Sequence, residues 1–301
     1  MTPIRIAVLV LCALPSLAAC RETPRAKAED LRKVAAAREA ELTRRMAVAD
    51  AQPGSMTELA KWIMPPQLKE ISGLALSPRG TVFTHNDNVG RVSEIDPKTG
   101  ILLKSWSLMG NQKGDFEAIT VAGSDVYLLA SNGRLFKFKE GGDGQQVPFS
   151  VYDTGLGKEC ELESLTYEAD SSRLVMACKR FLSKSDPHEL RIYRLPLPLG
   201  NRAAMTDITV PIDRVIGSNQ WKNFHPSDMN IDPFTKNYII VASHEKGLVE
   251  VTPDGEVVRS QPLPGDHRQP EGIAITKDSI LLVSDEANVM PPAITLYRWR
   301  P

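Results

Sequence analysis

Ile71-Ser72-Gly73-Leu74 is the first of five copies of one short phrase in this chain. The other four copies are Phe116-Glu117-Ala118-Ile119, Leu162-Glu163-Ser164-Leu165, Pro226-Ser227-Asp228-Met229 and Pro270-Glu271-Gly272-Ile273. An apolar run rich in β-branched residues follows each copy, and the second residues of consecutive copies lie 45, 46, 64 and 44 positions apart. A repeat of this length, made of short strands and turns, is typical of propeller blades, which must stack in a ring to bury both faces of each sheet. The sequence therefore predicts an all-β fold, a five-bladed β-propeller.

The first repeat shows the expected plan of a blade. We predict strands over residues 73–76, 82–84, 92–95 and 101–108, with a strong turn signal at Asp96-Pro97-Lys98-Thr99-Gly100 before the last. The third repeat is longer because residues 181–189 and 195–206 expand its connections, and this interval contains no sixth phrase.

The two ends of the repeat region predict how the ring closes. The last repeat stops at Trp299 after its third strand, and the apolar residues 59–64 stand just before the first repeat. This N-terminal segment can supply the missing outer strand, which would remove an exposed sheet edge. The alternative is that Trp62 and Ile63 only cover the side of the barrel.

Residues 1–20 are expected to be a lipoprotein signal peptide. Arg5 precedes an apolar stretch, residues 6–14, which is too short to span a bilayer, and Leu17-Ala18-Ala19-Cys20 resembles the bacterial lipobox. That resemblance implies cleavage before Cys20 and acylation of its sulfur and amino group, which suffices for stable anchoring in the lipid bilayer. Arg21 follows where an inner-membrane retention signal would have Asp. We therefore expect the outer membrane, with the protein facing the periplasm; the alternative is an ordinary secretory signal.

Residues 21–56 are expected to be a helical or flexible tether before the propeller domain, residues 57–301. Residues 26–51 lack Gly and Pro and carry good helix formers, with a narrow apolar stripe that Arg38 interrupts. A solvated helix fits this pattern best, and a short partner-binding seam is the alternative.

Composition limits the partners of the chain. It has 36 basic and 37 acidic residues and a formal net charge of -1, so nothing indicates nucleic-acid binding. Two of the four cysteines, Cys160 and Cys178, lie inside the third repeat and come close when its first two strands fold on each other. A disulfide is plausible in an oxidising periplasm. The alternative is a pair of reduced residues, with Cys178 buried as a small hydrophobe.

The repeated phrase should lie at one mouth of the central channel, because the first strand of each blade begins where the antiparallel second strand ends. Three carboxylates, Glu117, Glu163 and Glu271, should gather there with Asp228 beside them. Such carboxylates repel one another unless some are protonated or a cation binds. Oxygen ligands suit calcium before magnesium, so we predict a calcium site formed by these four residues. The alternative is that the glutamates accept hydrogen bonds from backbone amides.

Other polar residues should join this mouth from the phrases and from the loops after the second strands. The candidates for ligand binding are Ser72, Ser227, Asp87, His85, Asn132, His225, His244, Glu245, Asp285 and Glu286. The same loops place Lys179 nearby.

The five phrases, taken together with their flanking residues, resemble those of the SdiA-regulated family, distantly similar to NHL repeats. The resemblance covers roughly residues 60–301. It implies a five-bladed propeller with a calcium site in cell-envelope proteins whose activity is not established. Ser72 and Ser227 depart from a uniformly acidic ring.

Two classes of function are consistent with these features. The first is a non-catalytic, calcium-binding propeller in the envelope that binds a protein, a glycan or a small molecule. The second is a metal-dependent hydrolase like the lactonase and phosphotriesterase propellers, with His85, His225 or His244 as base. Fold does not carry function, and no catalytic motif such as Gly-x-Ser-x-Gly is present. We expect the binding module.

Overall fold

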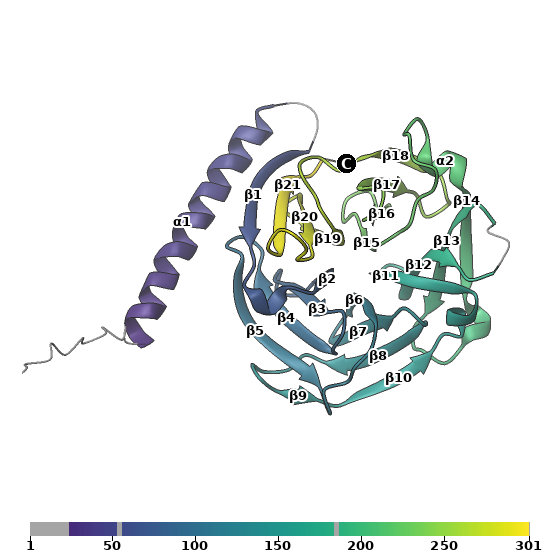
Figure 1. Ribbon diagram of the computed structural model, residues 1–301, viewed down its shortest axis with the longest axis horizontal. Coiled ribbons are helices and arrows are strands. Elements are labelled where there is room, and N and C mark those ends of the chain that lie inside the picture. Colours follow the sequence, from purple (N-terminus) through teal and green to yellow (C-terminus); the bar gives the residue numbers. More distant parts are fainter. Residues whose placement is uncertain (1–23, 53–55, 184–186, 301) are drawn as a thin grey trace, which may run out of the picture.

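The described part of the chain folds into five sheets arranged around one centre (Figure 1). The structure is a computed structural model of the 301-residue protein and describes residues 24–52, 56–183 and 187–300. The predicted all-β, five-bladed propeller is confirmed. The predicted signal peptide, residues 1–20, lies outside the described residues.

Each blade contains four main strands. Blade 1 consists of β2 (Ile71–Leu76), β3 (Val82–Asn86), β4 (Arg91–Asp96) and β5 (Ile101–Leu108), with the short β9 (Gln146–Val147) parallel to β5. Blade 2 consists of β6 (Phe116–Ala122), β7 (Asp125–Ala130), β8 (Arg134–Lys139) and β10 (Phe149–Asp153). Blade 3 consists of β11 (Cys160–Glu168), β12 (Arg173–Phe181), β13 (Glu189–Pro196) and β14 (Thr206–Pro211).

Blade 4 consists of β15 (Asp228–Ile231), β16 (Tyr238–Ala242), β17 (Gly247–Val251) and β18 (Val257–Pro262). Blade 5 consists of β19 (Pro270–Ile275), β20 (Ile280–Asp285), β21 (Ala293–Arg298) and the N-terminal β1 (Thr57–Ile63). The remaining elements are the helices α1 (Pro24–Asp50) and α2 (Ile212–Ile216) and the single-turn 3₁₀ helices Pro66–Leu68, Leu156–Lys158 and Arg202–Ala204. The long third repeat thus contains the turn Arg202–Ala204 and, after β14, the helix α2.

The innermost strands contact one another in the order β2, β6, β11, β15, β19 and back to β2, which closes the ring. Five clusters of buried apolar side chains hold the described residues together, and each draws on two neighbouring blades. A blade therefore buries its two faces against its two neighbours, as the repeat predicts.

Strand β1 closes the propeller as expected. It pairs antiparallel with β21 from Thr57 opposite Arg298 to Ile63 opposite Ala293, and becomes the outer strand of blade 5. Leu59 and Met64 are buried in the cluster between blades 5 and 1. The first and last blades are thus joined by a strand from the far end of the sequence.

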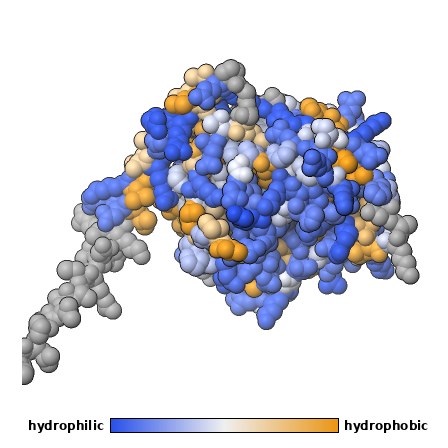
Figure 2. Space-filling view, turned by 45° about the horizontal axis from the view of Figure 1, so that its top comes forward, coloured by the Kyte–Doolittle hydropathy of each residue, from blue (hydrophilic) through white to orange (hydrophobic). Residues whose placement is uncertain are grey.

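Helix α1 forms as predicted, but its C-terminal half packs on the propeller beside β1 (Figure 1). Leu42 and Ala49 are buried in the same cluster as Leu59. The Arg38 guanidinium stacks 5.1 Å from the centre of the Trp62 ring and donates to the Thr99 carbonyl at 2.5 Å. The segment is therefore a docked helix rather than a free tether over this half. None of the described helices is both long and apolar enough to cross a membrane. Hydrophilic residues cover most of the propeller face seen in Figure 2.

Candidate functional site

The repeated phrase bends the inner strand of every blade at the channel mouth. The pairing of the first two strands shifts register within the phrase in four blades, between Ile71 and Leu74, Phe116 and Ala118, Leu162 and Ser164, and Pro270 and Gly272. In blade 4, the Ser227 N–H bonds to the Val241 carbonyl at 2.8 Å although Asp228 is the residue paired with Val241. Such β-bulges re-aim side chains next to functional sites. The recurrence of the phrase predicts this shared edge, and in these four blades the second residue of the phrase lies within the bulge.

Glu117, Glu163 and Glu271 gather as expected, but around a lysine. The Lys179 ammonium forms an ion pair with the buried Glu163 carboxylate. Its charge also acts on Glu117 and Glu271. The positive charge that this ring needs is therefore supplied, in part, by the chain itself.

The pKa values of the ring show how incomplete that compensation is. Burial, followed by the charge of Glu163, raises the pKa of Glu117 to about 9. Burial also raises the pKa of Glu163 to about 7, although Lys179 opposes the shift. Burial raises the pKa of Glu271 too, against the charge of Lys179 and hydrogen bonds with Ser243 and Gln269. At neutral pH the ring therefore holds protons as well as charge.

Asp228 differs from the three glutamates because its carboxylate accepts hydrogen bonds from backbone amides. It is fully buried, and its Oδ2 accepts the backbone N–H of Leu74 in blade 1 at 3.1 Å and of Ile273 in blade 5 at 2.9 Å. Its other oxygen has no hydrogen-bond partner among the described residues. Asp228 thus ties the inner strands of three blades together. The four residues predicted to bind calcium do not appear among the groups of described residues that bring three ligand atoms within 4.8 Å of one another.

Several other predicted mouth residues hold loops in place. Asp285 accepts the backbone N–H groups of Arg268 and Gln269 at 3.0 and 3.2 Å and contacts His267 Nδ1 at 2.6 Å. His267 is buried and also meets the Tyr297 hydroxyl at 2.8 Å, a role that the sequence did not reveal. These contacts fix the loop directly before the fifth phrase.

Four more of the predicted mouth residues are buried or engaged in hydrogen bonds within the protein. The Ser227 hydroxyl accepts the Ser243 N–H at 3.0 Å, the Asn132 side chain accepts the Arg134 N–H at 3.3 Å, and Ser72 is buried. Burial lowers the pKa of His85 to about 4, so this imidazole is neutral. Its side chain is buried, so it is not accessible to a ligand at the mouth.

A cluster of three carboxylates lies at the junction of blades 1 and 5. Oxygen atoms of Glu70, Asp87 and Glu286 lie within 4.8 Å of one another, and all three side chains are half-buried. Burial, then a hydrogen bond with Glu70, raises the pKa of Glu286 to about 8. Lys69 holds the pKa of Glu70 below its usual value. Asp87 and Glu286 were predicted at the mouth; Glu70 was missed because it precedes the phrase instead of following a second strand.

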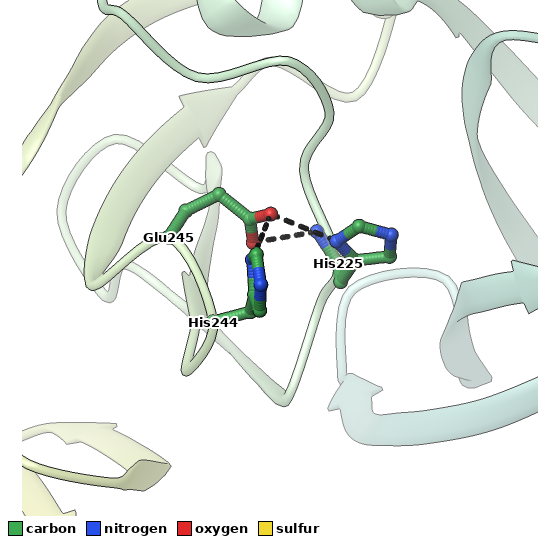
Figure 3. Close-up of side chains that lie close together, drawn as sticks. All are labelled: His225, His244 and Glu245. Atoms are coloured by element: carbon green, nitrogen blue, oxygen red, sulfur yellow. Dashed lines mark hydrogen bonds and ion pairs between the residues drawn. The ribbon is translucent and has the colours of Figure 1, made fainter.

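A second cluster, His225, His244 and Glu245, lies in blade 4 (Figure 3). His225 Nδ1 and His244 Nδ1 lie 2.8 and 3.0 Å from the same oxygen, Glu245 Oε1. The other oxygen, Oε2, accepts the His225 backbone N–H at 3.0 Å. Burial would raise the pKa of Glu245, but these hydrogen bonds bring it below its ordinary value, so the carboxylate is ionised.

A cavity of about 690 Å³ opens beside this cluster and the lysine of the ring. Its lining is mostly polar and basic: Glu161, Lys179, Arg180, His225, Ser243, His244, Lys246, Arg268, Gln269 and Glu271. We call it the mouth pocket. It joins the third, fourth and fifth blades at the end of the channel where the phrases lie.

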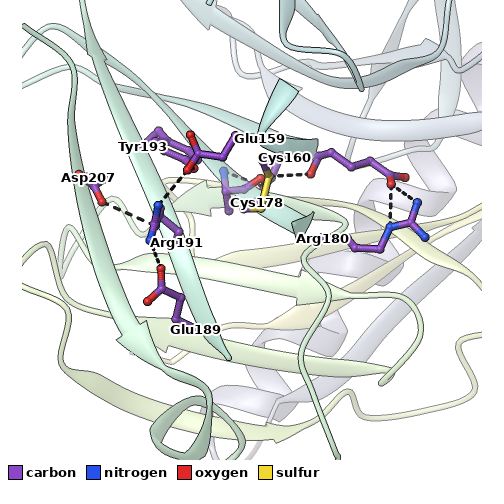
Figure 4. Close-up of a disulfide and its surroundings, with 11 residues drawn as sticks. Glu159, Cys160, Cys178, Arg180, Glu189, Arg191, Tyr193 and Asp207 are labelled. Atoms are coloured by element: carbon purple, nitrogen blue, oxygen red, sulfur yellow. Dashed lines mark hydrogen bonds and ion pairs between the residues drawn. A yellow bond between two sulfur atoms is a disulfide. The ribbon is translucent and has the colours of Figure 1, made fainter. Parts of the chain in front are cut away.

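The disulfide expected from the sequence is present (Figure 4), and the residues that follow each cysteine, Glu161 and Lys179, line the mouth pocket. Cys160 and Cys178 are bonded, with their Cα atoms 5.8 Å apart. The bond joins the start of β11 to β12 directly before Lys179 and Arg180, and the Arg180 guanidinium pairs with Glu161. It therefore holds two of the basic residues of the mouth pocket in position.

Comparison with known proteins supports the fold and the resemblance to a family. The structure is similar to glutaminyl cyclase from Myxococcus xanthus (13% identity over 81% of this chain and 95% of that one, TM-score 0.53). It is also similar to the PQQ-bound aldose sugar dehydrogenase from Streptomyces coelicolor (11% identity, 81% and 98% covered, TM-score 0.52). At these identities the similarity concerns the fold alone. The model of the SdiA-regulated family matches residues 205–294. The resemblance of this chain to the SdiA-regulated family is thereby confirmed over the fourth and fifth blades.

Proposed function

We propose that this protein is a lipid-anchored envelope protein whose propeller binds a ligand in the mouth pocket. The observation that carries the proposal is the pocket itself. Its volume, about 690 Å³, falls in the range of about 300–1,000 Å³ of small-molecule sites. Its lining combines four cationic side chains with the Glu161 and Glu271 carboxyl groups, which suits a small polar molecule or the end of a glycan or peptide better than an apolar ligand.

A reporter in the pocket tests this binding. A fluorophore attached through Lys246→Cys should respond saturably to a fraction of low-mass envelope extract. Ser243→Trp, which fills the pocket, should remove the response while the melting temperature stays within a few degrees. If no fraction changes the fluorescence, or if the filled variant responds equally, the pocket is not a ligand site.

Anchoring rests on the lipobox-like residues 17–20, and the docked half of α1 would then hold the propeller near the membrane. Cys20→Ser is expected to abolish acylation and to release the protein from membranes, because the remaining apolar stretch is too short to span a bilayer. Fractionation of cells expressing each form measures this. A Cys20→Ser protein that stays in the membrane fraction contradicts lipid anchoring.

For calcium, we propose the Glu70, Asp87 and Glu286 cluster as the site in place of the predicted ring. Ca²⁺–O distances of about 2.3–2.6 Å allow oxygens around one ion to lie up to about 5 Å apart, which the 4.8 Å limit of this cluster satisfies. In the ring, by contrast, Lys179 already supplies a charge, and Asp228 is engaged by two backbone amides.

Calcium is expected to stabilise the folded protein by mass action and so to raise its melting temperature. At a calcium concentration 100 times the Kd, the gain in the free energy of unfolding is about 2.7 kcal/mol. The double variant Asp87→Asn, Glu286→Gln should lose this response, and Glu163→Gln in the ring should keep it. Thermal melts with calcium and with a chelator measure both. If Glu163→Gln loses the calcium response and the double variant keeps it, calcium binds at the ring instead. If the wild type does not respond, the protein has no calcium site.

One observation favours the second class, a metal-dependent hydrolase. His225, His244 and Glu245 are residue types that bind catalytic metals, and the two histidines line the mouth pocket. Hydrolysis of a lactone or phosphotriester by the metal-loaded protein, lost in Glu245→Gln, would establish this function.

A further inference from the structure

The strongest feature that the proposed ligand binding leaves unused is the cluster of His225, His244 and Glu245, which brings three metal-ligand side chains together from two segments. His225 stands directly before the fourth phrase, and His244 and Glu245 lie in the turn between β16 and β17. Both segments reach the same edge of blade 4, because β15 and β16 are antiparallel. The fold therefore places these residues together at the mouth, in the arrangement drawn in Figure 3.

The spacing of the donor atoms is close to that of a zinc site. Zinc binds imidazole nitrogen and carboxylate oxygen at about 2.0–2.2 Å, and a tetrahedral arrangement then sets neighbouring ligand atoms about 3.3 Å apart. The two imidazole nitrogens lie 2.8 and 3.0 Å from Glu245 Oε1. Each of these two distances would need to lengthen by only a few tenths of an ångström to match that spacing.

The carboxylate of Glu245 is fixed before any ion arrives. Its side chain is 4% exposed, and the His225 backbone N–H holds Oε2 at 3.0 Å. Oε1 is then the oxygen that faces both imidazoles. An ion bound between them would take the place of the two Nδ1 protons, and each neutral ring would carry its proton on Nε2 instead. A supporting hydrogen bond on a ligating carboxylate is the usual second layer of a metal site.

The residues of the mouth pocket determine which ligand can occupy the fourth coordination position of the ion. Three protein ligands leave one position of a tetrahedron open, as in catalytic zinc sites. Both histidines line the mouth pocket, together with Lys179, Lys246 and Arg268. These cations would oppose a bare divalent ion, and they favour an anionic oxygen as its fourth ligand.

We propose that His225, His244 and Glu245 bind a divalent transition-metal ion of the zinc class, whose open position faces the mouth pocket and accepts an oxyanion. The site is separate from the carboxylate cluster proposed for calcium, and it does not depend on whether the pocket serves binding or hydrolysis.

Titration of the chelator-treated, full-length protein with Zn²⁺ tests the site. Calorimetry should show one ion per chain, and Co²⁺ in its place should give the visible absorption of a four-coordinate ion. His244→Ala and Glu245→Gln should each weaken binding by about 100-fold or more, the upper end of what loss of a merely supporting residue causes. Glu286→Gln, a carboxyl change at the same mouth but in the other cluster, is the matched control and should bind as the wild type does.

Thermal melts show whether each variant is folded, and Glu245→Gln keeps the acceptor for the His225 N–H. Absence of stoichiometric binding by the wild type would overturn the site and leave the histidines as hydrogen-bond donors to Glu245. Equal weakening by Glu286→Gln would overturn the assignment of ligands. Phosphate is the probe for the open position: it should shift the Co²⁺ spectrum, and an unchanged spectrum would overturn that part of the proposal.

Discussion

A chain that begins at residue 65 is expected to melt far below one that begins at residue 52. The first lacks β1 and leaves β21 of blade 5 without its outer partner, whereas the second keeps β1 and, among the described elements, lacks only α1. Losing one buried Leu or Met side chain typically costs about 2–5 kcal/mol, and β1 with the following residue buries both Leu59 and Met64. Because whole domains are stable by only about 5–15 kcal/mol, the shorter chain should be largely unfolded or aggregated through its exposed edges.

Two substitutions within β1 make the same test without a deletion. Leu59 is buried and Ile63 is 58% exposed, although both are apolar residues of one strand. Leu59→Ala should lower the free energy of unfolding by about 2–5 kcal/mol, and Ile63→Ala by less than about 0.5 kcal/mol. Denaturant melts of the two variants measure the difference. Equal losses, or equal melting temperatures of the two truncated chains, would show that β1 does not close the ring.

The architecture was accessible from the sequence because it depends on local patterns. The phrases, the turns and the β-branched runs recur in every blade, so five weak signals reinforce one another. Ring closure followed from the missing strand after Trp299, and the disulfide from the position of Cys160 and Cys178 on neighbouring strands.

The docking of α1 was not accessible from the helix pattern. Arg38 interrupts the apolar stripe and therefore indicates a solvated face. In the structure the same residue stacks on Trp62 and bonds to the Thr99 carbonyl, so it is part of the contact. The stem of a long charged side chain can pack on apolar surface while its charged group bonds to a polar partner. A hydropathy pattern counts such a residue only as polar and therefore does not predict the contact.

The chemistry of the mouth was only partly predictable for a related reason. Periodicity shows which residues reach one edge, and it placed Glu117, Glu163, Glu271 and Lys179 there. It does not show that the ammonium group sits among the carboxylates, or that Asp228 reaches amides of two other blades. The Lys179–Glu163 pair spans 16 positions across a register shift between β11 and β12. The Asp228 contacts join residues 45 and 154 positions apart.

The ring around Lys179 makes a prediction that depends on pH. In the folded state the pKa of Glu163 is about 7 and that of Glu117 about 9, above the ordinary value of 4.5 that applies when unfolded. Between pH 4.5 and 9 the folded protein therefore binds more protons than the unfolded one, and these groups make stability fall as pH rises. Burial lowers the pKa of Lys179, but the charge of Glu163 outweighs this and raises it above 10.5, so the lysine stays charged across this window.

Lys179→Met is expected to steepen this fall. At pH 8 the variant must ionise Glu163 without a partner or keep it protonated, and should lose about 2 kcal/mol. This is less than the 3–5 kcal/mol of a fully buried pair, because Lys179 is partly exposed. At pH 5 the carboxyl groups hold their protons in the folded state, so the loss should be small. Lys246→Met, which removes a cation from the same pocket, should show no such dependence on pH. Denaturant unfolding at both pH values measures the two variants. An equal loss at pH 5 and pH 8 would mean that the lysine matters only through its packing, and would leave the acidic ring without its internal counter-charge.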